Sequence, residues 1–385
     1  MAIAGPDTTA VTPTAGTDWV AVIKELGPDF ASRSAAHDAD DSFVAENYAA
    51  LKERGFFSAG VPSELGGGGA SHGEIAATLR ELGRYDSSTA LACAMHTHLV
   101  MTLAYLWRHG NPKVEPMLRR VAAEGLILVS TGGSDWLPGS GTLTKVEGGF
   151  KMSGRKIFGS GGPAGQVLMT TGIYDDPLAG PTVIHFPVPM KADGVKPQDT
   201  WRVLGMRGTG SNDIVLDDVF VPDAAMGGVR RPAGKWHPFM HTVALIALPL
   251  IFGVYLGIAE ATRDLALKAA AKKKSDEATP YLVGEMENEL LVAQLAFRSA
   301  IDIAATAEPG AAATHEIMSR RTLIGRHAIR ATEKAMEVAG GAAFFRAGTI
   351  ERLFRDVQAV RYHPMQEKAQ LRYSGRFLLG LDIDG

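Results

Sequence analysis

The sequence is short of cysteine and has no excess of positive charge, and both deficits narrow the classes of protein it can belong to. One cysteine, Cys93, among 385 residues excludes an intrachain disulfide framework and favours a reducing, cytoplasmic setting. The 39 Lys and Arg residues are balanced by 42 Asp and Glu residues, which gives a formal net charge of −3 at pH 7. Such a chain has no basic field to attract phosphates, so nucleic acid is not an expected partner.

Several motifs and segments are also missing. The first 17 residues lack a basic start followed by an apolar block, so no secretory signal is expected there. The longest apolar run, residues 243–259, contains Pro249 and is short for a bilayer span of about 20 residues, so we expect a buried helix and no membrane partner. No Walker motif, HExxH, paired CxxC or GxGxxG after a strand occurs, which argues against a Rossmann nucleotide site and leaves no expected metal site.

What the sequence does contain is a clear change of hydrophobic period along its length. From Trp19 to about Arg120 apolar residues recur at helical spacing, with breaks at Pro62 and at the glycine run 66–69. Short β-rich runs follow, at residues 126–130, 167–171, 182–186 and 213–216. Helical spacing returns after Trp236, over residues 242–274, 285–307, 312–338 and from 348 onward. This order predicts an α+β fold of helices, a small barrel or sandwich, and a helical bundle.

Six phrases are spread over nearly the whole chain. They are LKERGFF (51–57) with VPSELGG (61–67), DSS (86–88), GSD (133–135), GRKIFGSG (154–161), GMRGT (205–209) with VFVP (219–222), and GG (340–341) with ERLFRD (351–356). Their order resembles that of the acyl-CoA dehydrogenase superfamily. The resemblance implies an N-terminal all-helical domain over residues 1–125, a middle β-barrel over 126–235 and a C-terminal four-helix bundle over 236–385.

The resemblance also implies a bound flavin, whose flat ring needs an apolar wall and a few hydrogen-bonding groups. Phe158 matches the aromatic wall of the family, and Ser160 matches the hydroxyl beside flavin N5. The remaining implied cofactor contacts are Val129, Ser130 and Ser134 from the barrel, and Gly340 and Gly341 from the bundle, often of a neighbouring subunit. For each residue alone, a structural role explains the sequence equally well.

The sequence departs from the dehydrogenases at the catalytic base. Those enzymes remove an α-proton with a glutamate, because hydride transfer to the flavin needs a carboxylate over the substrate carbon. At the usual position this chain has Pro364, preceded by His363, and at the alternative position it has Ala247. Neither position carries a carboxylate, so ordinary acyl-CoA desaturation is not favoured.

A branch of the superfamily resembles this chain in lacking the base. It consists of two-component flavin monooxygenases, similar to the dibenzothiophene-desulfurising and nitrososynthase enzymes, which receive reduced flavin from a partner reductase. His363, His96 and Ser160 match the positions where that branch places catalytic histidines and a serine. His98 competes with His96, because residues two apart on a helix point about 200° apart. A turn-capping role for His363 and a core role for His96 are the structural alternatives.

The sequence leaves two alternatives for the flavin, FAD and FMN, and does not identify the substrate. The adenosine-gripping Arg-x-x-Phe-Gly phrase of the family is replaced by residues 272–280, KKKSDEATP, so FAD is implied by the resemblance and FMN is the alternative. A small apolar or aromatic substrate is suggested by Val100, Met101, Leu103, Phe239, Met240 and Ile246, which core packing explains as well. The rival functions are an acyl-CoA dehydrogenase with a displaced base and a non-catalytic flavin-binding member. The resemblance implies a homotetramer.

Overall fold

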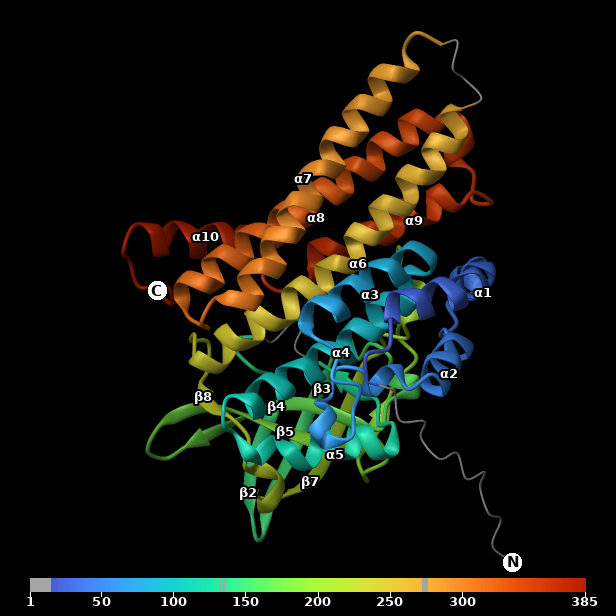
Figure 1. Ribbon diagram of the computed structural model, residues 1–385. Coiled ribbons are helices and arrows are strands. Elements are labelled where there is room, and N and C mark those ends of the chain that lie inside the picture. Colours follow the sequence, from blue (N-terminus) through green and yellow to red (C-terminus); the bar gives the residue numbers. More distant parts are fainter. Residues whose placement is uncertain (1–14, 132, 134–135, 272–275) are drawn as a thin grey trace, which may run out of the picture.

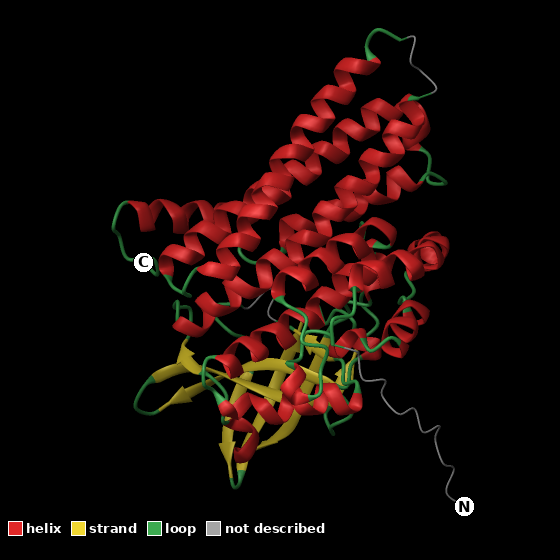
Figure 2. Ribbon diagram, viewed as in Figure 1, coloured by secondary structure: helices red, strands yellow, loops and turns green. Residues whose placement is uncertain are grey.

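The computed structural model describes residues 15–131, 133, 136–271 and 276–385. Helices and strands lie in separate regions, with an elongated group of C-terminal helices above, N-terminal helices in the middle and the sheet below (Figures 1 and 2). The N-terminal helices are α1 (Trp19–Asp40), α2 (Ala45–Glu53), α3 (His72–Tyr85), α4 (Ser87–Arg108) and α5 (Glu115–Glu124). The C-terminal helices are α6 (Pro238–Ala270), α7 (Thr279–Thr306), α8 (Ala311–Ala339), α9 (Thr349–Val357) and α10 (Glu367–Leu378).

The sheet is open, which corrects the expected barrel. Its strands are β1 (Leu128–Ser130), β2 (Thr142–Val146), β3 (Gly149–Lys156), β4 (Val167–Asp176), β5 (Gly180–Pro189), β6 (Val195–Pro197), β7 (Ile214–Pro222) and β8 (Arg230–Pro232). They follow the order β6-β7-β3-β2-β4-β5-β8, and β1 pairs in parallel with β4. Both ends of this order are three-residue strands, and no pairing joins them among the described residues. Closure would require such a pairing.

Side-chain caps place the start of α3 and of α4. Ser71 and Glu74 form a capping box at the start of α3, and the Asp86 carboxylate accepts from the Thr89 N–H at the start of α4. Because Asp86 alone separates the two helices, the direction of α4 toward the sheet is set at that residue.

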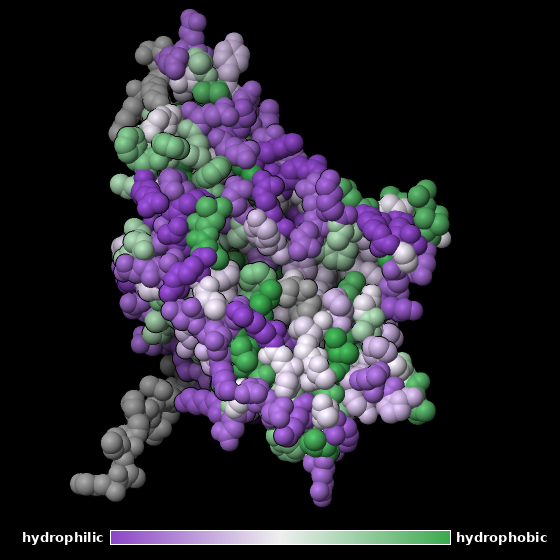
Figure 3. Space-filling model, turned by 180° about the vertical axis from the view of Figure 1, so that it is seen from behind, coloured by the Kyte–Doolittle hydropathy of each residue, from purple (hydrophilic) through white to green (hydrophobic). Residues whose placement is uncertain are grey.

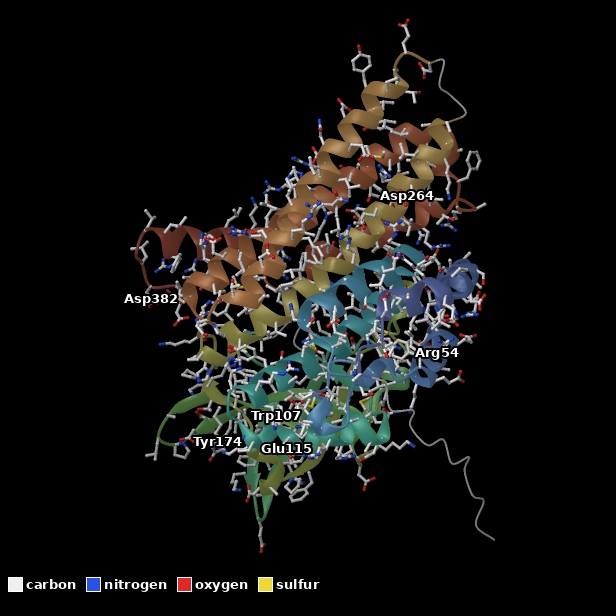
Figure 4. The ribbon with its side chains drawn as sticks, in the orientation of Figure 1. Arg54, Trp107, Glu115, Tyr174, Asp264 and Asp382 are labelled. Atoms are coloured by element: carbon white, nitrogen blue, oxygen red, sulfur yellow. The ribbon has the colours of Figure 1, made fainter. Side chains whose placement is uncertain are left out.

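The N-terminal and C-terminal helices share one hydrophobic core, which runs from Trp19 to Val360. Between α3 and α6 the buried carboxylate of Glu260 receives a bidentate pair from Arg80, and Arg84 donates to Asp264 over 2.7 Å (Figure 4). Such pairs fix the register of two helices more than they add stability. The proposed boundaries at residues 125/126 and 235/236 remain predictions, since packing joins the two helical regions.

Among the described residues, two helices are long and apolar enough to cross a membrane by length and composition alone, α4 and α6. In the most apolar window of each, 78% and 94% of the residues are buried inside the protein. The apolar run 243–259 lies in α6 and packs in the shared core, as the sequence indicated. Pro249 lies inside α6, where its ring removes one helical hydrogen bond.

Candidate functional site

A cavity of about 290 Å³ lies where the segment after β1, the start of α6 and the region around α10 meet. Its described lining consists of Gly133, Trp136, Leu137, Pro138, Gly234, Trp236, Pro364, Met365, Gln366, Ala369, Arg372, Tyr373, Ile383 and Asp384. Three aromatic rings meet here, with centroids 5.6 Å apart for Trp136 and Trp236 and 4.9 Å apart for Trp236 and Tyr373. The cavity therefore combines an aromatic cluster with polar surface, and Arg372 and Asp384 are its charged groups.

Two predicted residues are neighbours of residues that line this cavity. A Cβ atom at Gly133 would lie 3.2 Å from the ring of Phe158, so Phe158 lies directly behind Gly133. His363 precedes Pro364, which is also part of the lining. Phe158 is 38% exposed and has a φ of 59°, an uncommon backbone state for an aromatic residue. No hydrogen bond or ring contact joins His363 to Phe158 or Ser160 in the described parts of the chain.

His96 is fully engaged by backbone groups. Its Nδ1 accepts from the Leu128 N–H at 2.9 Å, so the ring proton lies on Nε2, which donates to the Phe57 carbonyl at 2.7 Å. The ring is 1% exposed, and burial lowers its pKa to about 4. These bonds attach α4 to β1 and leave His96 no free nitrogen for a substrate, which favours the core alternative over the catalytic hypothesis.

His98 is the histidine of this helix that meets a predicted cofactor residue. Its Nε2 lies 3.2 Å from the Ser130 hydroxyl at the end of β1, and its buried Nδ1 has no partner among the described residues. Burial, and next to it the neighbouring His96, lowers the pKa of His98 to about 4. By attaching α4 to β1, His96 holds His98 beside Ser130.

His363 lies against Tyr255 of α6 and Arg321 of α8. The Tyr255 hydroxyl is 2.6 Å from His363 Nε2, and Arg321 Nη2 donates to the His363 carbonyl at 2.8 Å. Burial, followed by Arg321 and then His98, lowers the pKa of His363 to about 3. The imidazole is therefore neutral at physiological pH. The dependence of this pKa on His98 also places the two histidines in one electrostatic environment.

Ser160 belongs to a chain of hydroxyl groups. Its Oγ lies 2.7 Å from Ser211 Oγ, which lies 2.7 Å from Thr209 Oγ1, and Thr209 donates to the Met206 carbonyl at 2.9 Å. Because the Thr209 proton is used at Met206, Ser211 donates to Thr209 and Ser160 donates to Ser211. Ser160 is thus left as a hydrogen-bond acceptor toward any ligand.

Residues 205–209, the GMRGT phrase, pack against the loop that contains Phe158 and Ser160. A Cβ atom at Gly205 would lie 2.4 Å from the Arg355 backbone, so only glycine fits this close approach. The Met206 N–H donates to Asp356 at 2.6 Å, and the Trp201 ring meets the Phe158 ring edge-on at 6.0 Å. Arg355 pairs with Asp38 and Glu351, so the Arg-Asp phrase serves structure.

The other predicted cofactor residues do not gather at the cavity within one chain. The Val129 side chain packs inside the sheet core. Gly340 and Gly341 begin η7 (Gly340–Phe344) at the far end of α8 in Figure 1, where nothing lies within 4 Å of a Cβ built on Gly341. Ser134 lies outside the described residues. The glycines therefore need a neighbouring subunit to meet a flavin bound beside Phe158.

The suggested apolar pocket residues pack in cores instead. Val100 and Leu103 lie in or against one cluster, Met101 and Ile246 in another, and the Phe239 ring meets the His185 ring edge-on at 5.0 Å. None of them, nor Met240, lines the cavity. Buried helix faces and pocket walls have the same apolar composition, so helical spacing alone could not distinguish pocket residues from core residues.

Sequence reasoning missed Tyr255, Arg321, Ser211 and Thr209. Tyr255 and Arg321 lie inside long helices at positions indistinguishable from core or surface residues. Ser211 follows the recognised GMRGT phrase by two residues, so a search for hydroxyls beside that phrase would have found it.

Acid is expected to destabilise the fold through its buried and half-buried histidines. The pKa of His96 and of His98 is about 4, and that of His185 and of His363 about 3, because burial disfavours the charged form. Unfolded histidines bind protons near pH 6.5, so stability is lost as pH falls from about 6.5 toward 3–4. Burial raises the pKa of Asp356 to about 6, and this single group acts in the opposite direction. Urea unfolding between pH 7 and 4 should show a loss on the order of several kcal/mol. A free energy of unfolding that does not change with pH would contradict the neutral assignment.

Two family models match the chain: the acyl-CoA dehydrogenase N-terminal domain over residues 23–123 and the acyl-CoA dehydrogenase C-terminal domain over residues 250–368. Together they cover more than half of the chain and both of its helical regions. The chain belongs to the acyl-CoA dehydrogenase family, with helical N- and C-terminal domains and a middle sheet domain.

Its relatives include both dehydrogenase and oxygenase names. A putative acyl-CoA dehydrogenase of Bacillus subtilis is 27% identical, over 91% of this chain and 94% of the relative. The amino sugar nitrososynthase DnmZ of Streptomyces peucetius is 27% identical (95% and 94% covered), and the dibenzothiophene monooxygenase of Mycolicibacterium goodii is 25% identical (93% and 92%). The X-ray structure of KijD3 in complex with FMN and a dTDP-linked amino sugar superimposes with a TM-score of 0.87 at 28% identity, covering 98% of both chains.

Proposed function

We propose that this chain is the oxygenase component of a two-component flavin monooxygenase acting on a small aromatic or apolar compound. The proposal rests on the residues at the position of the catalytic base, where this chain has Pro364 preceded by His363 and the dehydrogenases have a glutamate. Pro364 lines the cavity where a dehydrogenase needs a carboxylate, and a neutral His363 stands beside it. The nitrososynthase and dibenzothiophene monooxygenase relatives, and FMN in the KijD3 structure, support the same direction.

The residues beside the cavity fit a flavin ring. Phe158 offers an aromatic face next to Gly133, and Ser160 offers an oxygen whose own proton is used by Ser211. We propose that these two residues hold the ring, with Ser130 at the end of β1 and, from a neighbouring subunit, Gly340 and Gly341. FAD follows the family resemblance and FMN follows the KijD3 complex.

The reaction adds one oxygen atom of O₂ to the substrate and releases the other as water. When bound, a reduced flavin from a partner reductase supplies the two electrons and two protons. The chain's own residues bind and orient: Trp136, Trp236 and Tyr373 surround the substrate, and His363 donates a hydrogen bond near the reacting oxygen. Aromatic walls favour a ring compound of modest size, since the cavity holds about 290 Å³.

Stopped-flow spectroscopy tests this function. Chemically reduced FMN or FAD is mixed with aerated buffer with and without the protein. A monooxygenase is expected to give a spectrally distinct species between reduced and oxidised flavin that free flavin does not give. Reoxidation identical to that of free flavin would contradict the proposal, and flavin that stays bound on gel filtration without giving the distinct species would favour the non-catalytic flavin-binding alternative.

The hydroxyl chain predicts a preference for reduced flavin. Reduction places an N–H at N5, and an acceptor-only Ser160 pairs with that donor better than with the bare nitrogen of the oxidised ring. Ser211→Ala frees the Ser160 proton, so the affinity ratio of reduced to oxidised flavin should fall roughly three- to tenfold, the range of one neutral hydrogen bond. Anaerobic titration measures both constants. Ser153→Ala, which removes an exposed hydroxyl on β3, is the control. An unchanged ratio in Ser211→Ala would contradict the assigned direction of the chain.

We further predict a homotetramer. The C-terminal helices expose large apolar side chains: Leu291 and Leu295 of α7, Leu323 of α8, Phe344 and Phe345 after it, and Leu371, Leu378 and Leu379 around α10. Figure 3 shows hydrophobic side chains at the edge formed by the end of α10 and the loop after it. Exposed apolar surface of this kind marks subunit contacts. Sedimentation at micromolar concentration should give about four chains per particle, and a monomer would remove both the packing argument and a shared flavin site.

A further inference from the structure

The hydrogen bond of the Tyr255 hydroxyl decides where the His363 proton lies. Tyr255 is fully buried, and its hydroxyl is 2.6 Å from His363 Nε2. No second partner of this hydroxyl occurs in the described part of the chain. If Nε2 carried the proton and donated it, the phenolic O–H would be buried without an acceptor, which is unfavourable. The phenol therefore donates to Nε2, and the imidazole proton lies on Nδ1.

Arg321 opposes a second proton on His363. Its guanidinium is buried, donates to the His363 carbonyl and lies over the Phe252 ring at 4.7 Å. No carboxylate pairs with it among residues 276–385 or the other described ranges, and its Nε has no partner. The titratable or charged groups that face the imidazole are Arg321 from α8, His98 from α4 and Tyr255 from α6. None of the three is an anion at neutral pH, so an imidazolium would meet only unfavourable charge.

We propose that Tyr255 and Arg321 are positioning residues that hold His363 as a neutral imidazole protonated on Nδ1, so that His363 serves the site as a fixed N–H donor. His363 Nδ1 makes no hydrogen bond to the described residues and is not among their buried side-chain atoms without a partner. Because the residue is half-buried and precedes Pro364 of the cavity lining, we infer that Nδ1 is open to a ligand oxygen. The use of this donor rests on the proposed function. The protonation state itself does not, because it follows from contacts within the chain.

Nuclear magnetic resonance of the full-length protein without flavin tests the protonation state. Ring-¹⁵N-labelled histidine distinguishes the protonated nitrogen from the bare one, and the spectrum of His363→Asn identifies the His363 signals by their loss. We expect wild-type His363 to be neutral with its proton on Nδ1 between pH 5 and pH 8, where an ordinary histidine titrates near 6.5. Tyr255→Phe should shift the proton toward Nε2. Tyr174→Phe should leave the signals unchanged, because this tyrosine on β4 (labelled in Figure 4) is not among the described residues that line the cavity.

Turnover variants test the use of the donor. The asparagine amide reaches the position of Nδ1, whereas the glutamine amide reaches that of Nε2. His363→Asn should therefore retain at least about tenfold higher kcat than His363→Gln, because one correctly placed donor contributes about a hundredfold or more. Asparagine should also keep the pH profile unchanged, since no proton is exchanged by the donor.

These experiments test the protonation state of His363 separately from the proposed monooxygenase function. A wild-type His363 that is protonated at pH 7, or that carries its proton on Nε2, overturns the inference even if oxygenation is observed. If Tyr255→Phe leaves the proton on Nδ1, the positioning role of Tyr255 is wrong. The expected spectra together with a failed stopped-flow test would leave the inference standing and remove the monooxygenase function. Arg321→Met, if it folds, should raise the pKa of His363, and an unchanged pKa would remove Arg321 from the proposal.

Discussion

Replacing His363 by alanine is expected to lower kcat about a hundredfold to a thousandfold, the usual effect of losing one donor aimed at developing negative charge. The same substitution should lower the free energy of unfolding by about 1–3 kcal/mol, because the buried Tyr255 hydroxyl loses its acceptor. A histidine without a partner inside the chain would leave stability unchanged when replaced, and the Tyr255 bond is the reason for the expected loss. Steady-state kinetics and urea unfolding measure the two effects.

A double variant separates the rate effect from the stability effect. In Tyr255→Phe with His363→Ala both partners are gone, so no buried hydroxyl is left unpaired and much of the lost stability should return. Turnover should stay low, because the donor is still missing. If turnover per folded molecule recovers together with stability, His363 is a structural residue that closes a turn, and its catalytic assignment is wrong.

The order of helical and strand regions could be predicted from the sequence, because it is marked by long segments of regular apolar spacing and by glycine-rich phrases. Helices α6, α7 and α8 begin and end within a few residues of the predicted ranges, apart from the later start predicted for α7. Strands β2 and β3 were missed, because residues 142–156 are rich in lysine, threonine and glycine and are half exposed. The open sheet could not be foreseen, since closure depends on whether two short end strands meet, and no local pattern records that.

The site was harder to predict, because its chemistry depends on which side chains meet across distant segments. The phrase around residue 363 pointed to His363, and the sequence left His96 and His98 as alternatives. The bonds of His96 to Leu128 and Phe57 favour His98 as the residue that faces Ser130. Tyr255 lies 108 residues before His363 in the chain, so its role could be found only once packing was known.

Anaerobic mixing with an acyl-CoA thioester is expected to leave the flavin oxidised. Ala247 is buried in the helical core, and Pro364 lines the cavity, so neither base position of the family can take a proton. General-base catalysis contributes about a hundredfold to ten-thousandfold, and bleaching should be slower than in a dehydrogenase by that factor. Dithionite, which needs no base, should reduce the same bound flavin and shows that the cofactor is competent.

One carboxylate among the described cavity residues could support the rival dehydrogenase. Asp384 lines the cavity, and its Oδ1 accepts from the Trp236 N–H at 2.7 Å. Since one carboxylate oxygen is used for this bond and fixes the start of α6, we expect Asp384 to serve structure. Rapid bleaching by an acyl-CoA in the wild type would overturn the oxygenase proposal. Its disappearance in Asp384→Asn, with flavin affinity retained, would then identify Asp384 as the displaced base. Equal, negligible bleaching in both proteins is the result we expect, because a carboxylate held by the backbone at the cavity edge does not replace one held over the substrate carbon.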